Sequence, residues 1–505
     1  MLLLCCTHER GNVWTPVLTR MLGGMICLLL SAQALVAAPV VWDHIEDPLV
    51  RAAQFDLLVG QPFEAITRLE ADLDQGRIKH RPAQAQLVLG SLYLANGAHH
   101  KAASIFETLG NGKRNSDQPQ RVQNLAWLSL AQVQYQHGQT DEALVSLQRI
   151  NGELPGQAQQ ERLLLSAMLL MQQQNFDQAV VNLRQLGKKS LVRQLREKSV
   201  WETYGRFNLG VALFRQGKEE EGRTLLEKLG SGTADTEEQR ALRDKANLML
   251  AYHHLNKNEP EKAQQYFVKT RLQGPMSSRA LLGLGRVYSS RELHKKSLVP
   301  WLKLSKMDAS DPAVQDGLLA VPFAFGKLEA FKQALEYYQS ALERFKAEVA
   351  QVRQAEAAVN SDALADTLAR AVSNQPAGQR WLVQDLPNTP GGRYLWQLFT
   401  THEFQETLKN YVQLRRSLER LEQWSSQIDS ANGLEPAHRR ELEKRVLGVQ
   451  SELLSVLERT QTHLKVLAQK TLKRHEQRLL GYASEARFSM AQMYDYASKR
   501  WGSEP

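Results

Sequence analysis

Histidines stand beside acidic residues or beside each other at several places in this chain, as they do in many metal sites. The His-Glu pairs at 402–403 and 475–476 each lack the second histidine, one helical turn away, that a zinc-binding helix needs. The adjacent histidines at 99–100 and 253–254 would point in different directions from a helix, so they form no ligand pair. The acidic run at 219–221 is expected in a turn, facing solvent. We therefore predict no metal site.

The glycines of Gly283-Leu-Gly285 are the nearest approach to a phosphate-binding loop. A third glycine and a preceding strand are both missing, and such a loop needs them. We interpret the pair as small residues that let two helices approach closely. The segment 357–430, the one place where a catalytic part would fit, has few paired polar residues, and an enzyme there is only an alternative. We predict no catalytic residues and no cofactor.

The elements that hold these residues are predicted to be helices. The chain has 505 residues, of which 23% are charged and 43% hydrophobic, so it is long enough for several domains or one elongated array. Gly and Pro are sparse, and helix-forming residues fill the stretches between them. The formal charge is +9, but Lys and Arg are interspersed with acids. Solvated helix faces are the main interpretation, an anionic partner is the alternative, and we predict no nucleic-acid partner.

The first residues resemble an export signal. Arg20 precedes an apolar run at 21–38 that ends in small residues, which is typical of a cleaved secretory signal peptide over residues 1–38. Met21 is an alternative start, cleavage after Ala37 is an alternative to Ala38, and an uncleaved membrane anchor or a cytosolic chain are alternatives to export. The cysteines all lie in this leader, so the mature chain would have none: Cys5, Cys6, Cys27. A thiol-free mature protein suits the periplasm.

Residues 39–345 repeat a pattern with a period of about 34 to 43 residues. In each copy a small residue is followed about twelve positions later by a second small residue, with aromatic or leucine residues beside both. The copies are carried by Gly90, Tyr93, Ala102 and Phe106; Trp127, Ala131, Ala143 and Pro155; Ala167 and Ala179; Gly210 and Gly222; Ala251, Ala263, Phe267 and Pro275; Gly285, Tyr288, Ser297 and Trp301; and, more weakly, Ala65 with Leu69 and Ala334 with Tyr338. This pattern resembles the tetratricopeptide repeat (TPR) family in a degenerate, exported bacterial form.

The resemblance implies about eight helix pairs stacked into a superhelix with a concave groove, although the copy boundaries at 187–204 and 230–241 are not defined. Small residues are needed where two helices of a pair cross, so we expect Ala102, Ala143 and Ala263 at crossings. A generic helical bundle is the alternative.

The last third predicts long helices. A heptad seam runs through Tyr338, Phe345 and Val352, a helix end and linker rich in Pro and Gly fill 346–393, and a coiled-coil-like helical hairpin occupies 394–505. Its second arm, from Pro436 to about Tyr496, would be roughly 90 Å long. We expect the end of this arm to pack on the 345–352 seam, with self-association or a dedicated partner as alternatives. The predicted stripe of the arm is Leu442, Val446, Val449, Leu453, Val456, Leu464, Leu467, Leu479, Tyr482, Ala486, Met490 and Met493.

The fold class is thus all-α, a TPR-like superhelix followed by a helical hairpin, and the function that this implies is a periplasmic scaffold or adaptor for protein partners in a cell-envelope assembly. An accessory of envelope polysaccharide export or modification is the alternative. Membrane association would follow if the signal is not cleaved. The partner-binding groove is predicted on the first helices of the pairs, at Tyr135, Met168, Met171, Phe207, Phe214, Arg215, Tyr252, Arg279 and Arg286. The alternative is that these residues are buried between neighbouring repeats or covered by the C-terminal helices.

Overall fold

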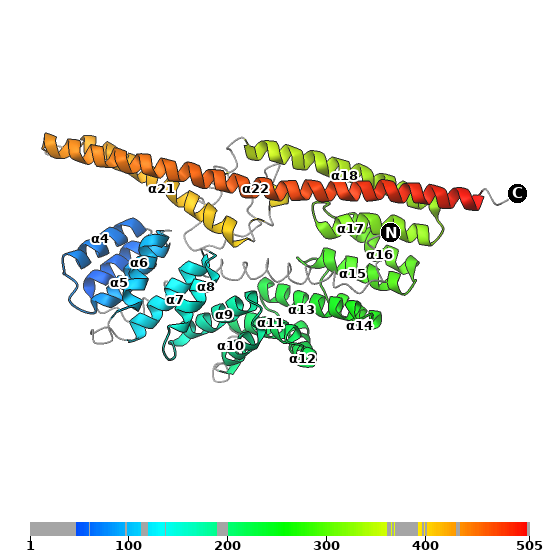
Figure 1. Ribbon diagram of the computed structural model, residues 1–505, viewed down its shortest axis with the longest axis horizontal. Helices are drawn as coiled ribbons and strands as arrows, with labels where there is room; N and C mark the ends of the chain where they lie inside the picture. Colours follow the sequence, from blue (N-terminus) through cyan, green and yellow to red (C-terminus); the bar gives the residue numbers. More distant parts are fainter. Residues whose placement is uncertain are drawn as a thin grey trace. The chain divides into compact units, whose positions relative to one another are not determined.

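A computed structural model describes residues 47–501, with gaps of which the longest fall at 113–119, at 189–199 and, apart from Ala365 and Leu368, at 361–391. All regular secondary structure in this described part is helical (Figure 1). The helices are α3 (Pro48–Leu58), α4 (Pro62–Asp74), α5 (Pro82–Ala95), α6 (His99–Gly110), α7 (Gln120–Gln136), α8 (Thr140–Gln148), α9 (Gly156–Gln172), α10 (Phe176–Lys188), α11 (Val200–Arg215), α12 (Glu219–Gly230), α13 (Glu237–Asn256), α14 (Pro260–Phe267), α15 (Ser277–Ser290), α16 (His294–Ser305), α17 (Pro312–Lys327), α18 (Phe331–Asn360), α20 (Gly392–Leu395), α21 (His402–Ser430) and α22 (Pro436–Trp501).

Helices α3 to α18 form successive pairs whose crossings use the small residues that the sequence pattern marks. Ala102, Ala143 and Ala263 are completely buried. A methyl group built on Gly222 would lie 2.9 Å from the carbonyl oxygen of Gly210, so α11 and α12 touch through their backbones. The expected crossings are confirmed, because contact this close leaves no room for a larger side chain.

The Gly283-Leu-Gly285 pair lies within α15 and has the packing role expected for it. A methyl group on Gly283 would lie 2.1 Å from the Phe267 ring, and one on Gly285 would lie 2.1 Å from Trp301 Nε1. The Trp301 indole donates a hydrogen bond to the Leu282 carbonyl at 3.2 Å. By contrast, the turn predicted at 219–221 is wrong, since these glutamates form the first turn of α12. Acidic side chains are favoured there by the helix dipole.

The chain divides into two compact units, and α9, α18 and α22 each contribute to both. One unit, here called unit 1, contains residues 163–355 and 472–505. In it the end of α22 packs on the last helix pair: the Tyr482 ring stacks on Phe345 with centroids 5.6 Å apart, and Arg478 Nε donates to Gln315 Oε1 at 2.9 Å. Arg353 and Glu476 form an ion pair at 2.6 Å. The predicted packing of the last arm on the α18 seam is confirmed at the Tyr482–Phe345 pair.

The other unit, unit 2, contains the helix pairs up to Arg162 together with residues 356–471. Here α21 packs on the first helix pair through Phe63 and Trp424, whose ring centroids are 5.2 Å apart. An ion pair of 3.2 Å joins His463 on α22 to Glu403 on α21. These contacts make α21 and the first part of α22 an antiparallel hairpin against the repeats of unit 2.

Only part of the stripe predicted along the first part of α22 is covered, since Leu464 is buried. Leu442, Val449 and Val456 are exposed at 37%, 46% and 37%, whereas Val446 and Leu453 are half-buried. In unit 2 the less exposed strip of this segment therefore runs through Val446 and Leu453. A single partner helix covers a narrower strip of a helix than the predicted stripe occupies.

Some expectations fall outside the described residues. They are the export signal at 1–38, most of the linker at 346–393, and the repeat boundary at 187–204 apart from its ends. Among the described helices, none has a stretch long and apolar enough to span a bilayer.

Candidate partner-binding groove

The residues predicted to line a groove all lie on the first helices of successive pairs. Tyr135 lies on α7 in unit 2, and the other eight lie on α9, α11, α13 and α15 in unit 1. These helices repeat the same geometry, so residues at equal distances from the small crossing residue occupy equivalent places.

Burial separates the nine residues into two groups. Met168 is 1% exposed, and Tyr135, Met171 and Phe207 are also buried. These four side chains pack between helices, the alternative that the sequence left open for them. Their surface is not available to a partner in this structure, and their role in binding remains a prediction.

The remaining five residues are half-buried, and all of them except Arg215 take part in contacts between neighbouring first helices. The Phe214 ring contacts His253 edge-on at 4.7 Å, and Tyr252 contacts Phe267 at 5.1 Å. The Tyr252 hydroxyl donates to the Arg279 carbonyl at 2.9 Å, which joins α13 to α15. Burial raises the pKa of this tyrosine above its usual value, so it remains a neutral donor.

A cation that the sequence analysis missed lies on the same face. Lys245 is six residues before the crossing residue Ala251, and Arg279 is six residues before Gly285, so the two occupy equivalent places on α13 and α15. The Lys245 amine lies 5.7 Å from the centre of the Phe207 ring. Burial, and then the positive charge of Arg279, lowers the pKa of Lys245 to about 7. The repeat spacing could have predicted the position of Lys245. The sequence could not show that Lys245 has no acidic side chain paired with it.

Acidic partners are unevenly distributed on this face. Asp316 on α17 occupies the place equivalent to Lys245 and Arg279. It lies 3.7 Å from Arg286 and accepts a hydrogen bond from the Tyr482 hydroxyl. Within the described residues Lys245 and Arg279 have no ion pair. Arg215, on α11, has its Nε and Nη2 atoms buried without a hydrogen-bond partner in the described part. Three cations on three successive first helices are thus left uncompensated.

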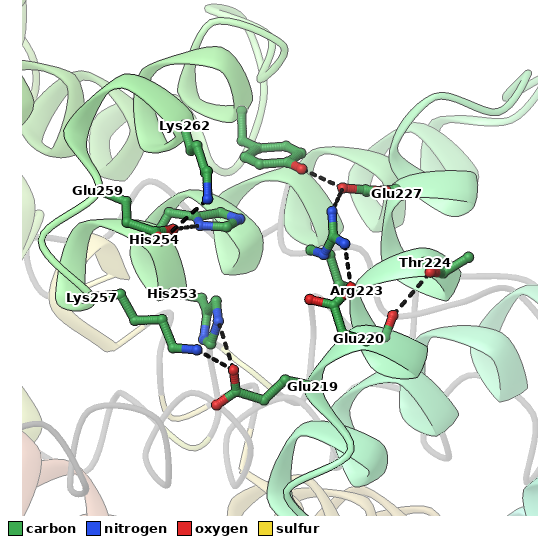
Figure 2. A network of polar contacts seen from close by, with 11 residues as sticks. Glu219, Glu220, Arg223, Thr224, Glu227, His253, His254, Lys257, Glu259 and Lys262 are labelled. Carbon is green, nitrogen blue, oxygen red and sulfur yellow. Dashed lines mark hydrogen bonds and ion pairs between the residues drawn. The ribbon is translucent and has the colours of Figure 1, made fainter.

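The acidic run of α12 belongs to a different arrangement, a network that joins α12 to α13 and α14 (Figure 2). Glu219 binds Lys257 and lies 3.7 Å from His253 Nε2, while His254 Nδ1 lies 2.6 Å from Glu259. The hydrogen bond from Lys257 lowers the pKa of Glu219, and burial lowers the pKa of His253.

At the other end of this network the Tyr266 hydroxyl donates to Glu227, and Arg223 pairs with Glu220 and Glu227. Burial, followed by the Glu227 contact, raises the pKa of Tyr266 to about 12. The network thus consists of matched donors and acceptors between neighbouring helices, an arrangement that fixes the stacking of two pairs. No three His, Cys, Asp or Glu side chains of the described residues come together as metal ligands.

Comparison with protein families finds one match. Residues 248–312 match the family described as "Tetratricopeptide repeat", over the helices that carry Ala251, Ala263, Gly285 and Ser297. No curated protein matches the chain significantly. The resemblance to TPR proteins is therefore confirmed, and the fold is an all-α array of TPR-like helix pairs with long helices after it.

Two solved structures illustrate the likeness. A tetratricopeptide repeat protein from Parabacteroides merdae is 15% identical, with a TM-score of 0.33, over 54% of this chain and 97% of its own. The apo form of the quorum sensor NprR from B. thuringiensis is 10% identical, with a TM-score of 0.34, over 58% of this chain and 97% of its own. Both TM-scores are below 0.5 and both identities are below 25%. The TPR-type fold itself belongs to the class of protein-interaction scaffolds.

Proposed function

We propose that this protein is a scaffold whose first-helix face in unit 1 binds an acidic segment of a partner protein. The observation that carries the proposal is the set of uncompensated cations at Arg215, Lys245 and Arg279. Tyr252, whose hydroxyl donates to the Arg279 carbonyl, is half-buried and supplies aromatic surface beside them.

Electrostatics favours a carboxylate-bearing ligand at this place. Lys245 is half-buried, and its ammonium is desolvated with no acid beside it, which is why its pKa is lowered to about 7. A carboxylate placed between Lys245 and Arg279 would restore the charged lysine and pair with the guanidinium. Because charge pairs shielded from water are worth more than exposed ones, a few such contacts can select an acidic segment from other sequences.

We further propose that the chain acts in the periplasm within a cell-envelope assembly. This rests on the apolar run after Arg20 and on the absence of cysteine after residue 27. Mass spectrometry of the mature N-terminus, together with cell fractionation, tests it. An intact Met1 or Met21 on a cytosolic protein would contradict export, and it would not affect the groove proposal.

The binding experiment compares two matched double variants of the full chain. Lys245→Ala with Arg279→Ala removes the proposed contacts, and Lys295→Ala with Lys296→Ala removes two exposed cations from α16. Partners are cross-linked in intact cells and identified by mass spectrometry. We expect the groove variant to lose cross-linked protein by about tenfold or more, and the control to behave as the parent. Equal capture by both variants would refute the groove proposal, and capture of polysaccharide in place of protein would favour the accessory function.

The pH dependence of binding offers an independent check. Free Lys245 is protonated mainly below pH 7, so above that pH binding of a carboxylate must take up a proton. The affinity for the captured partner should therefore fall as pH rises from about 7 to 9. A Lys245→Arg variant stays charged and should remove this dependence while keeping the affinity at pH 6. An identical pH profile in the parent and the arginine variant would exclude Lys245 from the contact.

A further inference from the structure

A row of apolar side chains remains uncovered on the first part of α22, in unit 2. Leu442, Val449 and Val456 follow one another at intervals of seven residues, and they are exposed at 37%, 46% and 37%. A seven-residue interval keeps side chains on one face of a helix, because it is nearly two full turns. The three residues therefore form a continuous apolar row about 21 Å long on the surface of the hairpin.

The row is separate from the less exposed strip of this segment. The less exposed residues of this segment, Val446 and Leu453, lie four residues after Leu442 and Val449 and form the neighbouring strip of the helix. No residue from 436 to 463 is buried. An exposed, heptad-spaced row of Leu and Val is typical of a helix that pairs with another helix.

Charged residues beside the row form a pattern that is symmetric about Val449. Arg445 lies four residues before Val449 and Glu452 lies three residues after it, and both are exposed. Farther out, Glu441 lies eight residues before and Arg459 ten residues after. Along this side of the helix, Arg445 and Glu452 thus lie at nearly equal distances from Val449 in opposite directions, and Glu441 and Arg459 do so within two residues.

We propose that this row is the interface with a second copy of the same chain, whose α22 lies antiparallel across it on a two-fold axis at Val449. In that arrangement Val449 meets Val449 of the second copy, and Leu442 meets Val456. Arg445 then lies within one residue of the register of Glu452, and Glu441 lies near Arg459, on the same side of the row. Isologous pairing of this kind requires a self-complementary surface, which this pattern supplies.

The existing ion pairs leave these charges available. Arg445 pairs with Glu441 in the same helix at 3.0 Å, but both side chains are more than half exposed, so the contact can be shared. In the described part of the chain, Glu452 and Arg459 have no ion pair. A different partner would need only an apolar row, whereas the mirror arrangement of charges is a specific requirement of self-pairing. The interface is independent of the groove proposed in unit 1.

The mass of the full chain in solution, measured by light scattering and sedimentation, tests this. The parent should be a dimer, and Val449→Glu should raise the dimer dissociation constant by about tenfold or more, because two glutamates would meet on the axis. Leu447→Glu is the matched control: Leu447 is 64% exposed on the same helix but away from the row, so its variant should dimerise as the parent does. Unchanged thermal melting would show that both variants remain folded.

A charge exchange makes the register falsifiable. Arg445→Glu alone would oppose Glu452 of the second copy and weaken the dimer, and Glu452→Arg alone would oppose Arg445. The double variant carries both changes on each chain and should restore the parent's dissociation constant. If the double variant dimerises no more tightly than the two single variants, the antiparallel register is wrong.

A cysteine variant tests the axis directly. In a background with Cys5, Cys6 and Cys27 replaced by Ser, Val449→Cys should form an intermolecular disulfide on mild oxidation, while Leu447→Cys should not. A monomeric parent, equal cross-linking of the two variants, or a dimer indifferent to Val449→Glu would each refute the proposal. The last of these outcomes would mean that the apolar row binds a different protein.

Discussion

One helix, α22, behaves differently along its length. From 436 to 463 it buries no side chain, although it contains eight leucine and valine residues. From 472 onward, in unit 1, Leu472, Leu479 and Ala486 are completely buried. Both segments have helical spacing of apolar residues, so the spacing alone does not decide burial. What differs is the number of helices within reach of each segment.

The comparison has a physical consequence for what each segment does. Burial of a leucine stabilises the fold by about 1.5–3 kcal/mol, so the second segment contributes to folding. Exposed leucines contribute little to folding and remain able to bind another surface. We therefore expect changes in the second segment to alter stability, and changes in the first to alter association.

Removal of the second segment should have the largest effect. A chain that ends after Gln477 loses Tyr482 and Ala486, and so uncovers Phe345 and Val352 on α18. It should aggregate or lose its cooperative melt, which calorimetry and light scattering would detect. If the truncated chain stays soluble and equally stable, the second segment does not contribute to folding. The end of α22 would then be a partner-binding tail.

Two leucine substitutions in the one helix give the next largest contrast. Leu479→Ala empties a completely buried position and should lower the free energy of unfolding by about 2–5 kcal/mol. Leu447→Ala, at 64% exposure, should change it by less than about 0.5 kcal/mol. Chemical denaturation of both variants measures the difference. Similar losses for the two would mean that the first segment is also covered in solution.

Acid should affect the second segment through His475. Arg478 Nη2 can only donate, so at 2.7 Å it requires an unprotonated His475 Nδ1. Burial, then Arg478 and Arg474, lowers the pKa of His475 to about 4. The unfolded chain binds more protons between pH 6.5 and 4, so the free energy of unfolding should fall as pH drops through this window, by at most about 3 kcal/mol.

A His475→Gln variant provides the control, because its side chain does not titrate. Between pH 7 and 4.5 it should lose less stability than the parent in denaturant melts. His438, exposed in the first segment, should give no such difference when it is replaced in the same way. A His475 variant with the parent's pH profile would contradict the assignment.

The smallest expected effect comes from Tyr482→Phe, which keeps the ring on Phe345 and removes the hydroxyl that donates to Asp316. Loss of a hydrogen bond to a charged group should lower the free energy of unfolding by about 1.5–3 kcal/mol, toward the lower limit because Asp316 also lies beside Arg286. Tyr494→Phe, at an exposed position of the same helix, is the control and should have no measurable effect. Equal results for the two would remove Asp316 from the contacts that hold α22.

The sequence predicted which helices carry the groove residues better than it predicted which of these side chains are exposed. Counting from Ala131, Ala167 or Gly210 placed each residue on a first helix, because the repeat period fixes which helix face turns inward. The same counting did not distinguish Met168, which is buried, from Arg279, which is half-buried. That difference depends on the size and approach of neighbouring helices, which vary from pair to pair in a degenerate repeat.

The sequence by itself determined that the described chain is helical and where its helices cross. Helix type follows from local periodicity, and a crossing requires small residues such as Ala263 and Gly285, so both are encoded within a few turns of chain. The tertiary structure decided which faces are covered and which charges are compensated. Lys245 lies near Phe207 of α11 and Arg279 of α15, which supply no acid. Val449 is exposed, whereas Val446 and Leu453 on the neighbouring strip are half-buried. Burial and electrostatic pairing join residues that are distant in the sequence, so only the packed structure contains them.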